Sequence, residues 1–195
     1  MRKSSIPKIS DHMQPDGTCS IWLSSIGLYP EKLEKCIALM KKLTKGDEMF
    51  FGHYRTDGFN LTDDEMERYG IEIPAYFREN GRYEPLTQVV EKRGKAKTYS
   101  GYLTVGSLPA DKITVEVLPQ IFHYYLETIC FCPKVDWATF VESYHNYMKH
   151  ETRDYITNGF ADLVFAYSDS GDFSISFSPN QYDKNAIYQE IENIL

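Results

Sequence analysis

The segment LVFAYSDSGDFSISF, residues 163–177, decides the fold class that this sequence predicts. Two β-rich runs, Leu163–Tyr167 and Phe173–Phe177, flank a polar turn at Asp169–Asp172, an arrangement typical of a β-hairpin. In the second run, phenylalanine and isoleucine alternate with serine, which gives the strand one apolar face and one polar face. The sequence therefore predicts a half-buried hairpin late in the chain.

A similar alternation occurs early in the chain, at Cys19–Ser25. One side of this predicted strand carries Cys19, Ile21 and Leu23, and the other side carries Ser20, Trp22 and Ser24. Further strands are predicted at Glu48–Arg55, Tyr99–Val105 and Ile113–Leu118.

Helices are predicted from apolar periodicity together with cap and stop residues. They begin at Pro30, at Thr62, at Pro119 (ending before Pro133), at Asp136 (running to Asn158) and at Asp183, with a brief helix at Pro85–Arg93. Residues 70–84 are predicted to be irregular. These elements predict a single α+β domain over residues 18–195, preceded by a flexible N-terminal arm over residues 1–17. The sheet is expected to be mixed or antiparallel and packed against several helices, with the C-terminal hairpin followed by a terminal helix.

Charge is distributed unevenly along the chain. Residues 1–109 carry 16 Lys and Arg against 15 Asp and Glu, whereas residues 110–195 carry 5 against 13. The two parts have net charges of +1 and −8, and the whole chain has −7. Such a field repels nucleic acid and anionic lipid and attracts cationic partners. The sequence therefore predicts a basic protein partner, no nucleic acid and no membrane.

The tyrosines and carboxylates of the acidic half suggest where that partner would bind. The chain has 15 tyrosines, and because each hydroxyl requires a partner or water, several are expected at the surface. Tyrosine is frequent at interface hot spots, and carboxylates speed association with basic proteins. The predicted partner-binding residues are Glu142, Tyr144, Tyr147, Glu151, Asp154, Asp169 and Asp172. A surface that only keeps the protein soluble is the alternative interpretation.

Cys19 is the candidate nucleophile of an alternative, enzymatic hypothesis. A cysteine that follows Gly17 and Thr18 at the start of a helix would gain thiolate character, and His53 or His123 could then act as its base. However, Cys19 begins a strand pattern, and no papain-type or caspase-type signature surrounds it. The preferred interpretation is a buried structural cysteine, and a cysteine hydrolase stays an alternative, as does a structural subunit of a larger assembly.

The sequence predicts no metal and no cofactor. Cys130-x-Cys132 and Glu142-x-x-His145 have the residue types of metal ligands but lack the further ligands that such sites need. Glycine-rich nucleotide loops and the Gly-x-Ser-x-Gly nucleophile motif do not occur. The four cysteines are too sparse for a disulfide framework, and no apolar run approaches the roughly 18 residues that a membrane span requires. These features predict a cytoplasmic protein.

An early strand at Gly17–Leu23 and a late hairpin around Ser170–Ser174, followed by a terminal helix, occur here in a small acidic chain. In these respects the sequence resembles bacterial toxin-immunity proteins. The resemblance implies a stoichiometric inhibitor that binds a cognate, often basic, toxin domain and blocks its active site or another essential surface. Immunity proteins share no single fold or site, so the resemblance assigns no functional residue.

Overall fold

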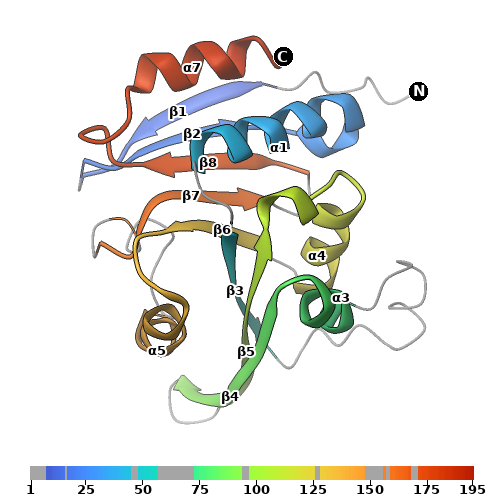
Figure 1. Ribbon diagram of the computed structural model, residues 1–195. Helices are drawn as coiled ribbons and strands as arrows, with labels where there is room; N and C mark the ends of the chain where they lie inside the picture. Colours follow the sequence, from blue (N-terminus) through green and yellow to red (C-terminus); the bar gives the residue numbers. More distant parts are fainter. Residues whose placement is uncertain are drawn as a thin grey trace.

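The computed structural model describes residues 8–15, 17–44, 48–56, 73–93, 97–125, 128–147, 156, 159–167 and 171–195. Its central element is an eight-stranded sheet (Figure 1). The strands are β1 (Ile9–Met13), β2 (Cys19–Leu23), β3 (Glu48–Thr56), β4 (Arg82–Arg93), β5 (Lys97–Pro109), β6 (Thr128–Pro133), β7 (Ala161–Tyr167) and β8 (Phe173–Phe177). Their order across the sheet is β1-β2-β8-β7-β6-β3-β5-β4, and neighbouring strands run antiparallel.

The predicted hairpin lies inside this sheet. Strands β7 and β8 pair with Phe165 opposite Ile175, and β8 then pairs with β2, with Ile175 opposite Ile21. Strands from the two ends of the chain are therefore neighbours in the sheet. The predicted α+β fold, with an antiparallel sheet and a hairpin followed by a terminal helix, is confirmed.

The helices of the described residues cover the two faces of the sheet unequally. They are α1 (Pro30–Thr44), α3 (Ile73–Asn80), α4 (Val117–Tyr125), α5 (Trp137–Tyr147) and α7 (Lys184–Glu192), with short 3-10 turns η1 (Ile26–Leu28) and η2 (Ala110–Lys112). Phe51 meets Phe77 of α3, with ring centroids 5.4 Å apart. Its neighbour Phe50 meets Phe140 of α5 at 4.9 Å. Since successive side chains of a strand point to opposite faces, α3 and α5 lie on opposite sides of the sheet.

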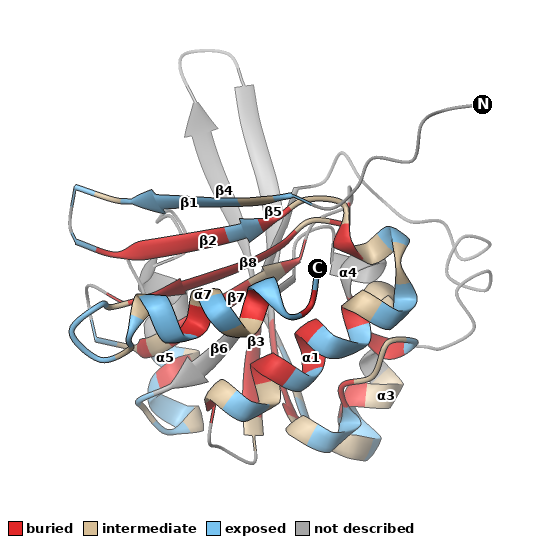
Figure 2. Ribbon diagram, turned by 90° about the horizontal axis from the view of Figure 1, so that it is seen from above, coloured by how far each residue is buried: buried red, intermediate tan, exposed pale blue. Residues whose placement is uncertain are grey.

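We call the face that carries Ile21, Phe51 and Ile175 the principal face. Its core contains buried residues of α1, α3, α4 and α7, including Ile187 and Ile191 of the terminal helix. Figure 2 shows α1 and α7 lying along the same side of β1, β2 and β8. Burying each aliphatic side chain in this core contributes roughly 1.5–3 kcal/mol relative to exposure. We call the other side, which carries Ser20, Trp22 and Phe50, the opposite face.

Several local predictions are wrong because strand pairing overrides local preference. Residues 70–84 contain α3 and the beginning of β4, and Pro85–Arg93 belongs to β4 and not to a helix. Strand β4 is an edge strand with a register irregularity between Pro85 and Gln88, and both features accommodate a proline.

The region after β5 also differs from the prediction. A strand is predicted at Ile113–Leu118. Residues 113–116 instead form a loop, and Val117 and Leu118 begin α4. The helix predicted to continue toward Pro133 ends at Tyr125, and β6 follows because Thr128–Pro133 forms ladders with both β3 and β7. The helix predicted at Thr62 lies outside the described residues.

The first residues of the chain also differ from the prediction. A loose arm is predicted over Met1–Gly17, but Ile9–Met13 forms β1 and pairs with β2, with Asp11 opposite Ile21. Its mostly exposed side chains are typical of an edge strand and gave no apolar pattern to detect. Residues 1–7 lie outside the described residues.

Two glycines with left-handed backbone provide a matched test of the turn before β8. Gly171 has φ +76° and Gly159 has φ +77°, so alanine is strained at both positions and should cost about 1–2 kcal/mol. A Cβ at Gly171 would also lie 3.2 Å from Cα of Gly27, whereas nothing lies within 4 Å of one at Gly159. We expect Gly171→Ala to lower the free energy of unfolding more than Gly159→Ala in guanidinium titrations. Equal losses would show that the approach to Gly27 does not constrain this turn.

Candidate functional site

Cys19 begins β2 on the principal face, where helices cover it. Only 1% of its surface is exposed, and its Sγ lies 3.9 Å from Sδ of Met13. Burial raises the pKa of the Cys19 thiol, because removal from water penalises the thiolate. The structure therefore places Cys19 as a buried thiol and opposes a role as nucleophile.

The two histidines proposed as its base lie on other elements, β3 for His53 and α4 for His123. Strands β8, β7 and β6 separate β2 from β3, a distance of roughly 19 Å at about 4.8 Å per strand. Helix α4 packs against β3 and β6. The described structure thus does not assemble the predicted cysteine hydrolase site.

We expect Cys19 to react slowly with iodoacetamide at neutral pH in the folded protein and rapidly after unfolding. Cys36 of α1 is an internal reference, since it is fully buried and burial raises its pKa to about 12. Peptide-level mass spectrometry after timed labelling reports each thiol separately. If folded Cys19 is labelled as fast as a free thiol while Cys36 is not, the buried-thiol interpretation fails.

The predicted partner-binding residues are only partly described. Glu142 is exposed on α5, and the backbones of Tyr144 and Tyr147 belong to the same helix. Asp172 immediately precedes β8. Helix α5 packs on Phe50 of β3, and strands β6 and β7 separate β3 from β8, so Glu142 and Asp172 lie on different elements of the fold. Glu151, Asp154 and Asp169 lie outside the described residues.

Other carboxylates of the acidic half are paired with lysines. Asp162 forms an ion pair with Lys134, and Glu190 of α7 forms one with Lys42 of α1. Tyr167 is 8% exposed, and burial raises its pKa. These two carboxylates are therefore neutralised locally, and this tyrosine faces inward.

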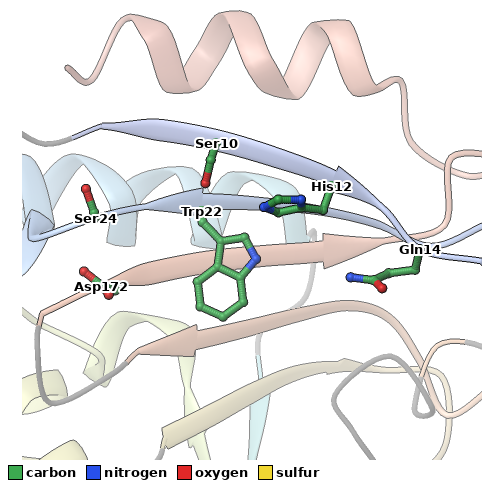
Figure 3. A pocket seen from close by; sticks show the side chains of 6 residues that line it. All are labelled: Ser10, His12, Gln14, Trp22, Ser24 and Asp172. Atoms are coloured by element: carbon green, nitrogen blue, oxygen red, sulfur yellow. The ribbon is translucent and has the colours of Figure 1, made fainter.

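A different feature is formed on the opposite face, at its β1–β2 end. A depression of about 400 Å³ is lined there by Ser10, His12, Gln14, Trp22, Ser24 and Asp172. Figure 3 shows Trp22 in the middle, with His12 and Gln14 on one side and Ser24 and Asp172 on the other. We call this feature the Trp22 depression.

Strand register explains why these residues meet. Trp22 lies opposite Ser10 of β1 on one side and opposite Ser174 of β8 on the other. The indole is 43% exposed, although its neighbour Ser174 is only 3% exposed. Beside them, Ser20 and Ser176 are buried with their hydroxyl oxygens 2.8 Å apart. Buried serines on the neighbouring strand positions therefore surround the base of the exposed Trp22.

Asp172 holds one rim of the depression in place. Its Oδ1 accepts a hydrogen bond of 2.6 Å from the backbone N–H of Ser25, whose φ is +57°. Next to this contact, the N–H of Gly27 donates to the carbonyl of Gly171 at 2.8 Å. These bonds fix the turn after β2 against the turn before β8, so the Asp172 carboxylate has a defined position.

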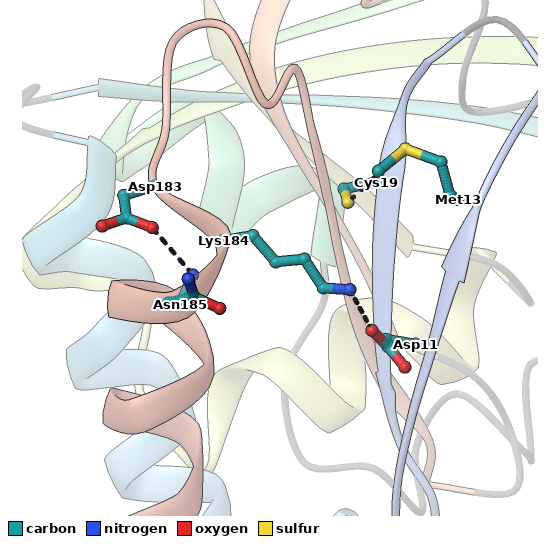
Figure 4. A network of polar contacts seen from close by, with 6 residues as sticks. All are labelled: Asp11, Met13, Cys19, Asp183, Lys184 and Asn185. Atoms are coloured by element: carbon teal, nitrogen blue, oxygen red, sulfur yellow. Dashed lines mark hydrogen bonds and ion pairs between the residues drawn. The ribbon is translucent and has the colours of Figure 1, made fainter.

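The other rim depends on β1, which α7 anchors from the principal face. Lys184 at the start of α7 forms an ion pair with Asp11 of β1 (Figure 4). The hydrogen bond from Lys184 lowers the pKa of Asp11, and the same contact raises the pKa of Lys184. Asp183 caps this helix by accepting from the N–H of Asn185 at 2.9 Å. Ser10 and His12, on either side of Asp11, are thereby presented to the opposite face.

The chemistry of the lining residues favours binding. Serine, histidine and aspartate are the residue types of a hydrolytic triad, but His12 pairs with Ser20 and Asp172 lies four positions along from Ser176. That offset separates them by roughly 14 Å along the strands, too far for a hydrogen bond. No group of three or more His, Cys, Asp or Glu within the described ranges is placed to hold a metal ion.

The chain matches no protein-family model, and comparison with curated proteins and with solved structures finds no match. In the part of the chain that the structure describes, no helix is both long and apolar enough to cross a membrane. The site is therefore interpreted from its own geometry.

Sequence reasoning identified Asp172 by its charge but missed Trp22. One signal was present, because Trp22 is the large aromatic residue on the serine side of the Cys19–Ser25 alternation. An aromatic ring at a polar strand position indicates either a cover over that face or a contact surface. Deciding between these needed the identity of the neighbouring strands.

The coupling between the buried hydroxyls of Ser20 and Ser176 can be measured with a double-mutant cycle. Ser20→Ala or Ser176→Ala alone should lower the free energy of unfolding by about 1–2 kcal/mol, because each leaves a buried hydroxyl without its present partner. The double variant should lose about 1 kcal/mol less than the sum of the single losses. Ser10→Ala, at an exposed position of β1, serves as the control and should change stability by less than about 0.5 kcal/mol. Additive losses would contradict coupling between the two serines.

Proposed function

We propose that this chain is a non-enzymatic binding protein that recognises a basic protein partner and acts as a stoichiometric inhibitor of the toxin-immunity type. The observation that carries the proposal is the 43% exposed indole of Trp22, set in a polar depression beside Asp172. Tryptophan is strongly enriched among residues that dominate protein interfaces. The net charge of −7 favours a partner of opposite sign.

The arrangement of reactive groups supports binding over catalysis. The Cys19 thiol is buried on the principal face, away from the depression. Within the depression, Asp172 is engaged by the backbone of Ser25, and His12 lies on the other side of Trp22 (Figure 3). A surface built in this way offers an aromatic contact and hydrogen-bonding groups on a rigid sheet, which is what recognition of another protein requires.

The toxin-immunity part of the proposal rests on charge and on the resemblance of the two ends of the chain to such inhibitors. A secreted toxin domain that acts on nucleic acid or anionic surfaces carries excess positive charge, so an acidic inhibitor is steered toward it. Stoichiometric inhibition also requires no catalytic group of the inhibitor. A gene for a large secreted toxin adjacent to the gene for this chain would support the proposal independently.

The proposal predicts a basic partner that forms a one-to-one complex. The full chain is immobilised, proteins from its native host are captured, and each captured protein is then purified and mixed with the chain. Native mass spectrometry should give one copy of each protein. Stopped-flow association should slow by about tenfold or more between about 50 and about 500 mM NaCl, because salt screens the attraction.

An unrelated acidic protein of matched size and net charge is the control bait. If nothing basic is enriched on this chain relative to that bait, or if association does not depend on salt, the proposed function is wrong. Charge reversal of Glu142, Glu151 and Asp154 tests separately whether the α5 region contributes. A slower association in that triple variant would assign part of the interface to this region.

A further inference from the structure

We propose that the Trp22 depression binds a single cationic side chain of the partner, preferably an arginine, between the indole of Trp22 and the carboxylate of Asp172. This inference rests on the proposed function, because the arginine is supplied by the basic protein partner. It adds the position of the contact and the chemical group that is recognised.

The indole supplies the first half of the site. A cation over the face of a tryptophan ring is attracted by the ring's negative π surface, and tryptophan is the strongest of the aromatic residues in this respect. Trp22 is exposed from a rigid position, since its strand is paired on both sides, with β1 and with β8. Its cross-strand neighbour Ser174 is buried, so the strands that hold the ring are packed beside it.

The carboxylate supplies the second half. Asp172 is half-buried, and its Oδ1 is held by the N–H of Ser25 at 2.6 Å. A carboxylate has two oxygens and about four acceptor positions, so a guanidinium can share it with the donors that already bond it. Because the group is already fixed, little side-chain entropy is lost when a cation pairs with it.

The rest of the lining fits a guanidinium. Ser10, Ser24 and Gln14 provide oxygen acceptors, and none of the described lining residues is lysine or arginine. Arginine has five N–H donors in a planar group that stacks on aromatic rings and pairs with carboxylates through two bonds. Lysine offers a compact charge without that planar face, so arginine fits the combination of ring and carboxylate better.

Lys8 provides an internal check on the sign of the charge. Its backbone N–H donates to Oγ of Ser24 at 3.2 Å, which places the backbone of Lys8, though not its ammonium group, beside the rim. An ammonium group near the rim repels a cationic ligand and attracts an anionic one. Neutralising Lys8 should therefore tighten binding of a cation, or leave it unchanged, and should never weaken it.

The test uses a hexa-arginine peptide and the full chain in low salt. Isothermal titration calorimetry measures the affinity, and a hexa-citrulline peptide, which has nearly the same shape without the charge, is the ligand control. The chain contains two tryptophans, so a Trp137→Phe variant leaves Trp22 as the only indole and its fluorescence reports directly on the depression. We expect saturable binding of hexa-arginine with a change in Trp22 fluorescence, and no binding of hexa-citrulline.

Four variants locate the binding. Trp22→Leu should weaken hexa-arginine binding by roughly 5–30-fold, and Asp172→Asn by about tenfold while keeping the acceptor for Ser25. Glu79→Gln removes one negative charge from the exposed surface of α3 and is the matched control, expected to change affinity by less than about twofold. Lys8→Gln should keep or increase the affinity. Thermal unfolding of each variant confirms that the fold is retained.

Two results would overturn the inference. Equal weakening by Glu79→Gln and Asp172→Asn would mean that hexa-arginine responds only to overall charge. Binding of hexa-citrulline as tight as hexa-arginine would assign the depression to a neutral ligand. Because the peptide experiment needs no partner, its failure together with successful capture of a basic protein would move the interface elsewhere and leave the proposed function intact. Arginine binding at Trp22 without any captured basic protein would support the site in the depression and contradict the proposed function.

Discussion

The pairing of β2 with β8 is the contact on which the rest of the structure depends. It joins positions 156 residues apart at Ser20 and Ser176. Ordering so long a loop costs conformational entropy, and the apolar residues of the principal face offset that cost when α1 and α7 cover them. The same pairing brings Trp22 next to Ser174 and carries Asp172 to the turn at Ser25. The same pairing thus defines the fold and assembles the candidate site.

The unequal coverage of the two faces explains where a site can exist. Helices α1, α3, α4 and α7 contribute to the core of the principal face, which leaves no access to residues such as Cys19. On the opposite face, α5 packs against Phe50 of β3, several strands away from β1. On the opposite face of β2 and β8, the neighbours of Trp22 are small serines, so the indole projects beyond the side chains around it. A rigid sheet with a helix-supported back can hold such a contact surface without further scaffolding.

Elements with a strong local pattern could be predicted from the sequence, and elements defined by their partners could not. Strands β8 and β2 carry a period of two and helix α1 a period near 3.6, while β7 is a short apolar run before a turn. Strands β1 and β4 are the edges of the sheet, and β4 contains a proline, so both lack that pattern. The same division holds for the site. Asp172 could be chosen by charge, but its contact with Ser25 and its proximity to Trp22 depend on pairing between distant strands.

Net charge and the Trp22 depression act at different distances, and this resolves why the acidic half need not be one continuous surface. Long-range attraction depends on the summed charge of the molecule, and ion pairs such as Asp162–Lys134 leave that sum at −7 because lysines are already counted in it. In the proposed function, the summed charge would govern how fast a basic partner arrives. How long it stays depends on short-range contacts in a desolvated pocket, where one fixed carboxylate beside one indole is worth more than many scattered acids. The proposed function thus attributes the association rate to net charge and the residence time to the Trp22 depression.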